Sequence, residues 1–198
     1  MEVAREEFEE DILHLGGGGE EVSSDSVWTA TRNRFAWLLV NLGTAALASL
    51  VIGLFDATIE QMVALAVLMP IVASMGGNAG TQSLTITVRA LATKELTPFN
   101  ALRSVRKELV VGILNGLLFA LLAGILTYFW FDNLLLGGVI GGAMVINMVV
   151  AGVSGAFLPL FFDRIGIDPA VASGVFVTTV TDVVGFFAFL GLASLVFL

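Results

Sequence analysis

The sequence contains no cysteine, only one histidine and only nine lysine or arginine residues among 198 positions. Without cysteine, the chain has no disulfide bond and no thiolate metal site, and its redox compartment stays open. The single histidine, His14, lies in an acidic segment, where a surface position is a simpler interpretation than a metal ligand. Any metal site in this chain is therefore expected to use oxygen ligands.

Charged residues of both signs are scarce, and this scarcity indicates a membrane protein. Only 13% of the residues are charged, whereas 57% are hydrophobic. No soluble domain of this length needs so large an apolar fraction, so the composition predicts a polytopic membrane protein. The 22 glycines suit the close helix packing that is common in lipid.

The net charge of −8 comes from the amino end alone. Residues 1–25 contain nine acids and one base, whereas residues 26–198 contain eight acids and eight bases. This segment lacks the basic start of a signal peptide, so cleavage is not expected. Its negative charge also argues against binding to nucleic acid or to anionic lipid.

The chain divides into an amino-terminal segment and a membrane domain. Residues 1–15 are predicted to form an acidic amphipathic helix on the cytoplasmic side, and residues 16–26 a flexible linker that begins with four glycines. Residues 27–198 are predicted to form an all-α membrane domain of five helices. Each apolar run exceeds the roughly 20 residues needed to cross the hydrocarbon. The predicted spans are about 35–55, 61–92, 109–131, 134–162 and 173–198.

The basic residues predict the orientation of the chain. All those after residue 26 precede the first span or lie at or in the second and fourth connections: Arg32, Arg34, Arg89, Lys94, Arg103, Arg106, Lys107 and Arg164. The short turn expected at residues 55–61 and the loop near residue 132 contain acidic residues but no basic ones. The positive-inside rule therefore places the amino terminus in the cytoplasm and the carboxyl terminus outside the cell membrane.

Asp182 is the only charged residue in the last apolar span. A carboxylate at membrane depth is costly unless it faces water, a cation or the protein interior, so the default interpretation is a transport or relay site. Thr178 and Gly185 lie on the same helical face, and a carbonyl near Thr178 is placed to meet a cation together with Asp182. The alternative is a structural carboxylate that is hydrogen-bonded between helices.

A polar stripe runs along the second span, where polar residues at positions 74–87 interrupt the apolar pattern. Ser74, Asn78 and Gln82 are spaced by four residues and share one helical face. In lipid these side chains must find water or protein partners, so they form either the wall of a hydrated path or contacts between helices. Oxygen ligands of this kind suit Mg²⁺, which keeps several of its waters, although Mn²⁺, Co²⁺ and protons also fit.

Several motifs, in the expected order, resemble the transmembrane domain of the MgtE family of magnesium channels. The resemblance covers about residues 28–198. The matching runs are Ser74-Met-Gly-Gly-Asn-Ala-Gly-Thr-Gln-Ser83, Val88-Arg-Ala-Leu-Ala92, Lys107-Glu-Leu-Val-Val-Gly112, Ile167-Asp-Pro-Ala170 and Thr178-Thr-Val-Thr-Asp-Val-Val-Gly-Phe186. The resemblance implies a homodimer with a magnesium-selective pore on its two-fold axis, built mainly from the second and fifth helices.

The resemblance also implies roles for individual residues. Asp182 matches the selectivity aspartate that holds a largely hydrated Mg²⁺, Thr178 matches its backbone carbonyl partner, and Asn78 matches the pore asparagine. Cytoplasmic acids that bind regulatory Mg²⁺ in the closed state are matched by Asp168, Glu108, Glu7, Glu10 and Asp11. Without the resemblance, Asp168 is more simply a helix cap before Pro169. The family usually carries an N domain and a pair of CBS domains, and these 198 residues include neither.

Two other functions stay open at this point. Asp182 would titrate in each cycle of a proton- or Na⁺-coupled carrier of divalent cations. In a dimer, two copies of Asp182 would also meet in an intramembrane aspartyl protease, but that chemistry needs two carboxylates about 3 Å apart that share a proton. A hydrated cation between the carboxylates needs more room, so we expect a transporter of Mg²⁺ rather than an enzyme.

Overall fold

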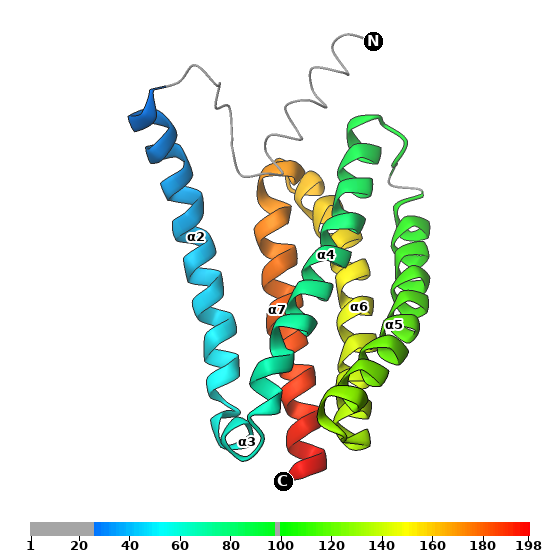
Figure 1. Ribbon diagram of the computed structural model, residues 1–198. Helices are drawn as coiled ribbons and strands as arrows, with labels where there is room; N and C mark the ends of the chain where they lie inside the picture. The colour runs from blue at the N-terminus through cyan, green and yellow to red at the C-terminus, as the bar shows by residue number, and fades with distance from the viewer. Residues whose placement is uncertain (1–25, 98–99) are drawn as a thin grey trace.

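The computed structural model describes residues 26–97 and 100–198, and its regular secondary structure there is helical (Figure 1). The elements are α2 (Val27–Gly53), α3 (Asp56–Gln61), α4 (Ala64–Ala92), α5 (Ala101–Phe131), α6 (Leu134–Arg164) and α7 (Pro169–Phe197). Within the described residues, five of these helices are long and apolar enough to cross a membrane. The prediction of an all-α chain with five spans is confirmed, whereas the acidic helix expected at 1–15 and the linker up to residue 25 lie outside the described residues.

Three elements extend or divide the predicted spans. The helix α2 begins at Val27, before the apolar span predicted from near residue 35, and α5 begins at Ala101, before the span predicted from near residue 109. Both extensions contain arginines, which suit a helical turn at the membrane surface but not an apolar run. The turn expected at 55–61 contains the short helix α3, whose first residue, Asp56, accepts a hydrogen bond from the backbone N–H of Ala57 at 2.7 Å.

The polar residues that interrupt the apolar pattern of α4 lie within one helix. The helix is continuous from residue 64 to residue 92. The hydroxyl of Thr81 donates to the carbonyl of Gly77 at 2.9 Å, and the hydroxyl of Thr85 donates to the carbonyl of Thr81 at 2.8 Å. Because these hydroxyls bind carbonyls one turn earlier, they need no break in the helix.

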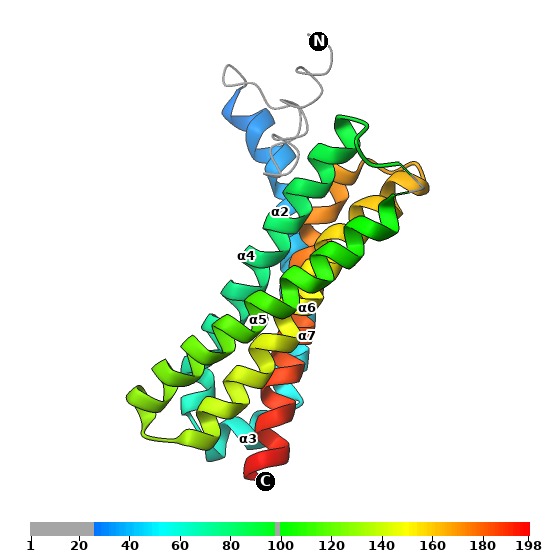
Figure 2. The same cartoon turned by 90° about the vertical axis from the view of Figure 1, so that its right-hand side faces the viewer.

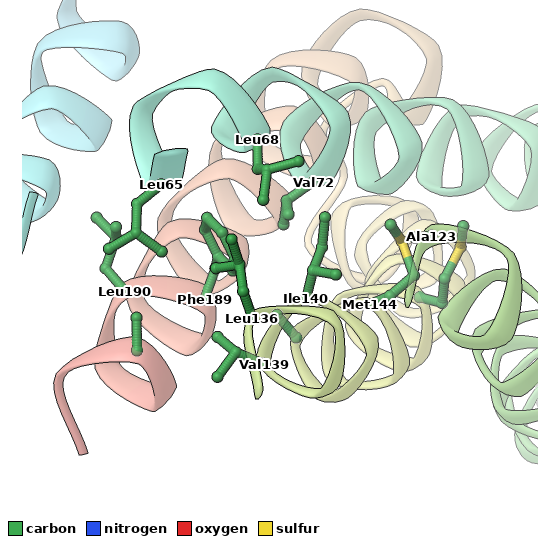
Figure 3. Close-up of a cluster of buried hydrophobic side chains, with 13 residues drawn as sticks. Leu65, Leu68, Val72, Ala123, Leu136, Val139, Ile140, Met144, Phe189 and Leu190 are labelled. Carbon is green, nitrogen blue, oxygen red and sulfur yellow. The ribbon is translucent and has the colours of Figure 1, made fainter. Parts of the chain in front are cut away.

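The centre of the bundle is α6, which packs against α4, α5 and α7. Figure 3 shows buried leucines of α4 facing Ile140 of α6 and Phe189 of α7. Figure 2 shows α5 beside α6 along much of its length. Glycine makes this contact close, since a Cβ atom on Gly112 would lie 2.8 Å from the carbonyl oxygen of Met148. The close helix packing expected of the glycines is therefore confirmed at this contact.

The ends of the helices define a basic end of the bundle, where α2 begins, α4 ends, α5 begins and α6 ends (Figure 1). The opposite end contains α3, the junction of α5 and α6, and the carboxyl terminus. The helix α2 stands apart from the bundle and packs mainly against α7. Near α3 the rings of Phe55 and Phe187 meet edge to face at a centroid distance of 5.7 Å.

Candidate functional site

The polar stripe of α4 lies on an exposed face of the described chain. Ser74, Asn78 and Gln82 are all exposed, and the amide of Asn78 donates to the hydroxyl of Ser74 at 3.4 Å. The side chain of Gln82 makes no hydrogen bond to any described residue. Lipid cannot satisfy exposed amides at membrane depth, so this face requires water or another protein surface.

Close packing at Gly80 sets the register between α4 and α7. A Cβ atom on Gly80 would lie 2.5 Å from Cγ1 of Val177 and 3.5 Å from Cγ2 of Thr181. These two residues are one turn apart on α7, so Gly80 sits at their level. Only glycine allows α7 to approach α4 this closely.

A second contact lies further from the basic end, where Asn147 of α6 separates α4 from α7. A Cβ atom on Gly76 would lie 2.2 Å from Nδ2 of Asn147, and one on Gly185 would lie 2.6 Å from the same atom. Nδ2 donates to the carbonyl of Val72 at 2.8 Å, whereas the buried Oδ1 has no partner among the described residues. The amide of Asn147 therefore fills the space that two glycines leave open.

These two contacts place Asn78 and Asp182 at about the same depth. On α4, Asn78 lies midway between Gly76 and Gly80. On the antiparallel α7, Asp182 lies between Thr181, which meets Gly80, and Gly185, which meets the same amide of Asn147 as Gly76 does. The two side chains that sequence analysis singled out on different spans are thus brought to one level of the bundle.

Asp182 is half-buried, and its carboxylate has no hydrogen bond or ion pair with any described residue. The alternative interpretation was a structural carboxylate that is hydrogen-bonded between helices. No described residue forms such a bond with Asp182. A carboxylate without a protein partner at this depth needs water or a cation beside it.

Thr178 lies one turn before Asp182 and presents its two oxygens differently. Its hydroxyl is turned back along α7 and donates to the carbonyls of Gly174 at 3.1 Å and Val175 at 3.0 Å. Its carbonyl accepts a hydrogen bond from the hydroxyl of Thr181 at 3.0 Å. The carbonyl of Thr178, rather than its hydroxyl, is therefore the oxygen to consider beside Asp182.

Glu108 lies in a separate environment. It is only 5% exposed, and its carboxylate accepts a short hydrogen bond from the hydroxyl of Ser83 on α4. It lines a cavity of about 180 Å³ between α4, α5 and α6, together with Gln82 and Asn115. This glutamate is thus held inside one chain.

Asp168 is exposed at the start of α7, where its carboxylate accepts a hydrogen bond from the backbone N–H of Ala170 at 2.8 Å. The capping interpretation of this residue is confirmed. Within residues 26–97 and 100–198, no three acidic or histidine side chains gather as a metal-binding group. The three other acids expected at a regulatory site, Glu7, Glu10 and Asp11, lie outside the described residues.

Two polar residues of this region, Asn147 and Ser83, were not predicted to contribute to it. Asn147 is the only amide in the span from Leu134 to Arg164, and a lone amide in an apolar helix commonly marks a helix contact. The sequence therefore contained a signal that could have identified Asn147. It contained no such signal for Ser83, because the partner of Ser83 is 25 residues away on another helix.

Comparison with known proteins adds an independent result. A family described as "MgtE: Divalent cation transporter" matches residues 69–192, which include both Asn78 and Asp182. Three relatives carry the name "Magnesium transporter MgtE". The one from Bacillus subtilis (strain 168) is 30% identical over 195 residues, and the one from Enterococcus faecalis is 33% identical over 195 residues. The one from Thermus thermophilus is 35% identical over 202 residues.

Each similarity covers 98% of this chain but only 43% or 44% of the relative. The chain thus spans less than half the length of the relatives it matches, and the matched part includes all five long helices.

Proposed function

This chain belongs to the MgtE family, and on that premise we propose that it conducts Mg²⁺ across the cell membrane. The observation that carries the proposal is the common depth of Asn78 and Asp182, with a carboxylate that has no partner among the described residues. The names of the three relatives, all magnesium transporters, indicate the ion. The proposed activity is transport, not an enzymatic reaction.

The proposed pore needs two copies of the chain. A two-fold axis along the exposed stripe of α4 would set Ser74, Asn78 and Gln82 of both copies around one aqueous path. Two carboxylates of Asp182 would then face the same ion, and their charges would balance that of Mg²⁺. This arrangement offsets the cost of placing each acid at membrane depth. The glycine at 185 keeps α7 close to Asn147 at this level.

The proposed filter holds Mg²⁺ through the waters that this ion releases reluctantly. The carboxylate of Asp182 accepts hydrogen bonds from these waters, the carbonyl of Thr178 lies beside them one turn earlier on α7, and the exposed amide of Asn78 completes the polar wall. A site made only of oxygen atoms also admits Mn²⁺ and Co²⁺.

The basic end of the bundle is proposed to face the cytoplasm, as the positive-inside rule predicts. The ion then moves inward down the membrane potential, which contributes about 4.6 kcal/mol per 100 mV for a divalent cation, twice the single-charge value. Regulatory Mg²⁺ is proposed to bind at this end through Asp168, together with Glu7, Glu10 and Asp11. Glu108 would join such a site only after its carboxylate left the hydroxyl of Ser83.

Flux of Mg²⁺ into proteoliposomes tests the proposal. Asp182→Asn keeps the size of the side chain and removes its charge, so we expect the flux to fall at least about tenfold, the effect of roughly 1.4 kcal/mol. Asp163→Asn is the matched control, because Asp163 is an exposed acid at the basic end of α6. If Asp182→Asn conducts as well as the wild type, the filter assignment is wrong. A flux that requires a proton or Na⁺ gradient would favour a coupled carrier.

A further inference from the structure

The carbonyl oxygen of Thr178 has both of its acceptor positions occupied. A carbonyl has two lone pairs, and in an α-helix one accepts from the N–H four residues later, here that of Asp182. The hydroxyl of Thr181 donates to the same oxygen at 3.0 Å and takes the second position. No lone pair of this carbonyl is left for a cation.

Packing against α4 keeps Thr181 in this position. Thr181 is fully buried, and its Cγ2 methyl lies 3.5 Å from where a Cβ atom on Gly80 would be. With the methyl directed at α4, the hydroxyl points back to the carbonyl of Thr178. A buried hydroxyl away from water loses free energy if it gives up its acceptor. The contact between α4 and α7 therefore keeps the carbonyl capped.

We infer that Thr181 is a specificity-determining residue that excludes direct coordination of the ion by the carbonyl of Thr178. This inference rests on the proposed function and concerns how the filter treats the hydration shell. A capped carbonyl cannot replace a water in the first shell of a cation. The ion is then held through its own waters, as suits Mg²⁺.

Ca²⁺ is the informative competitor. It accepts about six to eight oxygen ligands in a flexible geometry and loses water more readily than Mg²⁺. Removal of the hydroxyl of Thr181 frees one lone pair of the carbonyl of Thr178, which is the type of ligand that Ca²⁺ takes directly. The balance between the two ions should therefore shift toward Ca²⁺.

The neighbouring threonine supplies a matched control. The hydroxyl of Thr179 donates to the carbonyl of Val175 at 2.6 Å, so it makes the same type of bond within the same helix. It does not touch the carbonyl of Thr178. Thr179→Val removes a bond of this type from α7 while leaving the cap of Thr178 in place.

The experiment compares Mg²⁺ and Ca²⁺ flux into proteoliposomes for the wild type, Thr181→Val, Thr181→Ser and Thr179→Val. Valine keeps the shape of threonine, so Thr181→Val preserves the packing against Gly80. We expect Thr181→Val to raise the ratio of Ca²⁺ to Mg²⁺ flux by about two- to tenfold, the range of one hydrogen bond. Thr181→Ser and Thr179→Val should keep the wild-type ratio. Thr181→Ala makes the same test if the valine variant is not monodisperse in gel filtration.

An unchanged ratio in Thr181→Val, or an equal change in Thr179→Val, would overturn the inference. Asp182→Asn in the same assay separates this outcome from failure of the proposed function. If Asp182→Asn abolishes Mg²⁺ flux while Thr181→Val keeps the wild-type ratio, the filter assignment stands and the role of Thr181 does not.

Discussion

At the scale of single residues, the membrane makes polar side chains informative. Asp182 and Asn78 were singled out because a charge or an amide in an apolar span needs a reason, and packing brings them to one depth. The same reasoning could not find the partner of Glu108, because the pairing with Ser83 depends on how α4 and α5 both lie against α6. The sequence shows which residues are polar, whereas the register of the packed helices determines which polar residues meet.

Block by an inert ion tests whether Asp182 recognises a hydrated cation. Cobalt hexammine resembles hydrated Mg²⁺ but does not exchange its ligands, so it can bind only through its outer shell. We expect it to block Mg²⁺ flux in the wild type and to lose at least about tenfold in potency in Asp182→Asn, which lacks the charge. The control Asp163→Asn should be blocked like the wild type. Equal block of Asp182→Asn would show that the blocker binds elsewhere.

The hydrogen bond between Ser83 and Glu108 should contribute to stability rather than to selectivity. Ser83→Ala leaves the buried carboxyl group without its donor, which costs about 1–3 kcal/mol. We expect a lower midpoint of thermal unfolding in detergent and an unchanged ratio of Ca²⁺ to Mg²⁺ flux. Thr85→Val is the control, because Thr85 is exposed and its hydroxyl bonds only within α4. Equal midpoints for the two variants would contradict this role.

At the scale of helices, the sequence predicted how many there are but not where they end. The span α6 was predicted to within two residues at its end, because its apolar run and its helix nearly coincide. The helices α2 and α5 begin before their predicted apolar spans, because arginine-bearing turns extend beyond the apolar runs. The resemblance implied that α4 and α7 build the pore together, but the register of their contact was not predicted, since it depends on Asn147 filling the space beside two glycines.

A pair of substitutions tests that contact. Gly76→Ala would place a Cβ atom 2.2 Å from the amide nitrogen of Asn147, and overpacking of this kind costs about 1–3 kcal/mol. Asn147→Ala removes the amide and makes room for the added methyl group. We therefore expect the double variant to be more stable than the sum of the two single effects predicts. Thermal unfolding in detergent measures all four proteins, and strict additivity would show that the two residues do not compete for space.

At the scale of the whole molecule, a polar face has no partner among residues 26–97 and 100–198 of one chain. The exposed stripe of α4 lies in a bundle whose other exposed surfaces are rich in leucine, valine and phenylalanine. Leucine and valine suit lipid, but Ser74, Asn78 and Gln82 do not. The proposed second copy around a two-fold axis would give this face an aqueous path, and it would explain why five spans with one intramembrane carboxylate suffice for a divalent ion.

The absence of cysteine makes the dimer directly testable. A single cysteine at Gln82 would lie on the stripe that faces the proposed axis, whereas one at Leu118 would lie on the exposed face of α5. We expect a short thiol-specific bifunctional reagent to join two copies of Gln82→Cys in nanodiscs but not two copies of Leu118→Cys, because only residues near the axis approach their own counterparts. The product is read as a doubled mass in denaturing electrophoresis, and native mass spectrometry gives the unlinked assembly. A monomer that retains full Mg²⁺ flux would require a path through one bundle. Cross-linking of both variants alike would indicate random collision rather than an interface.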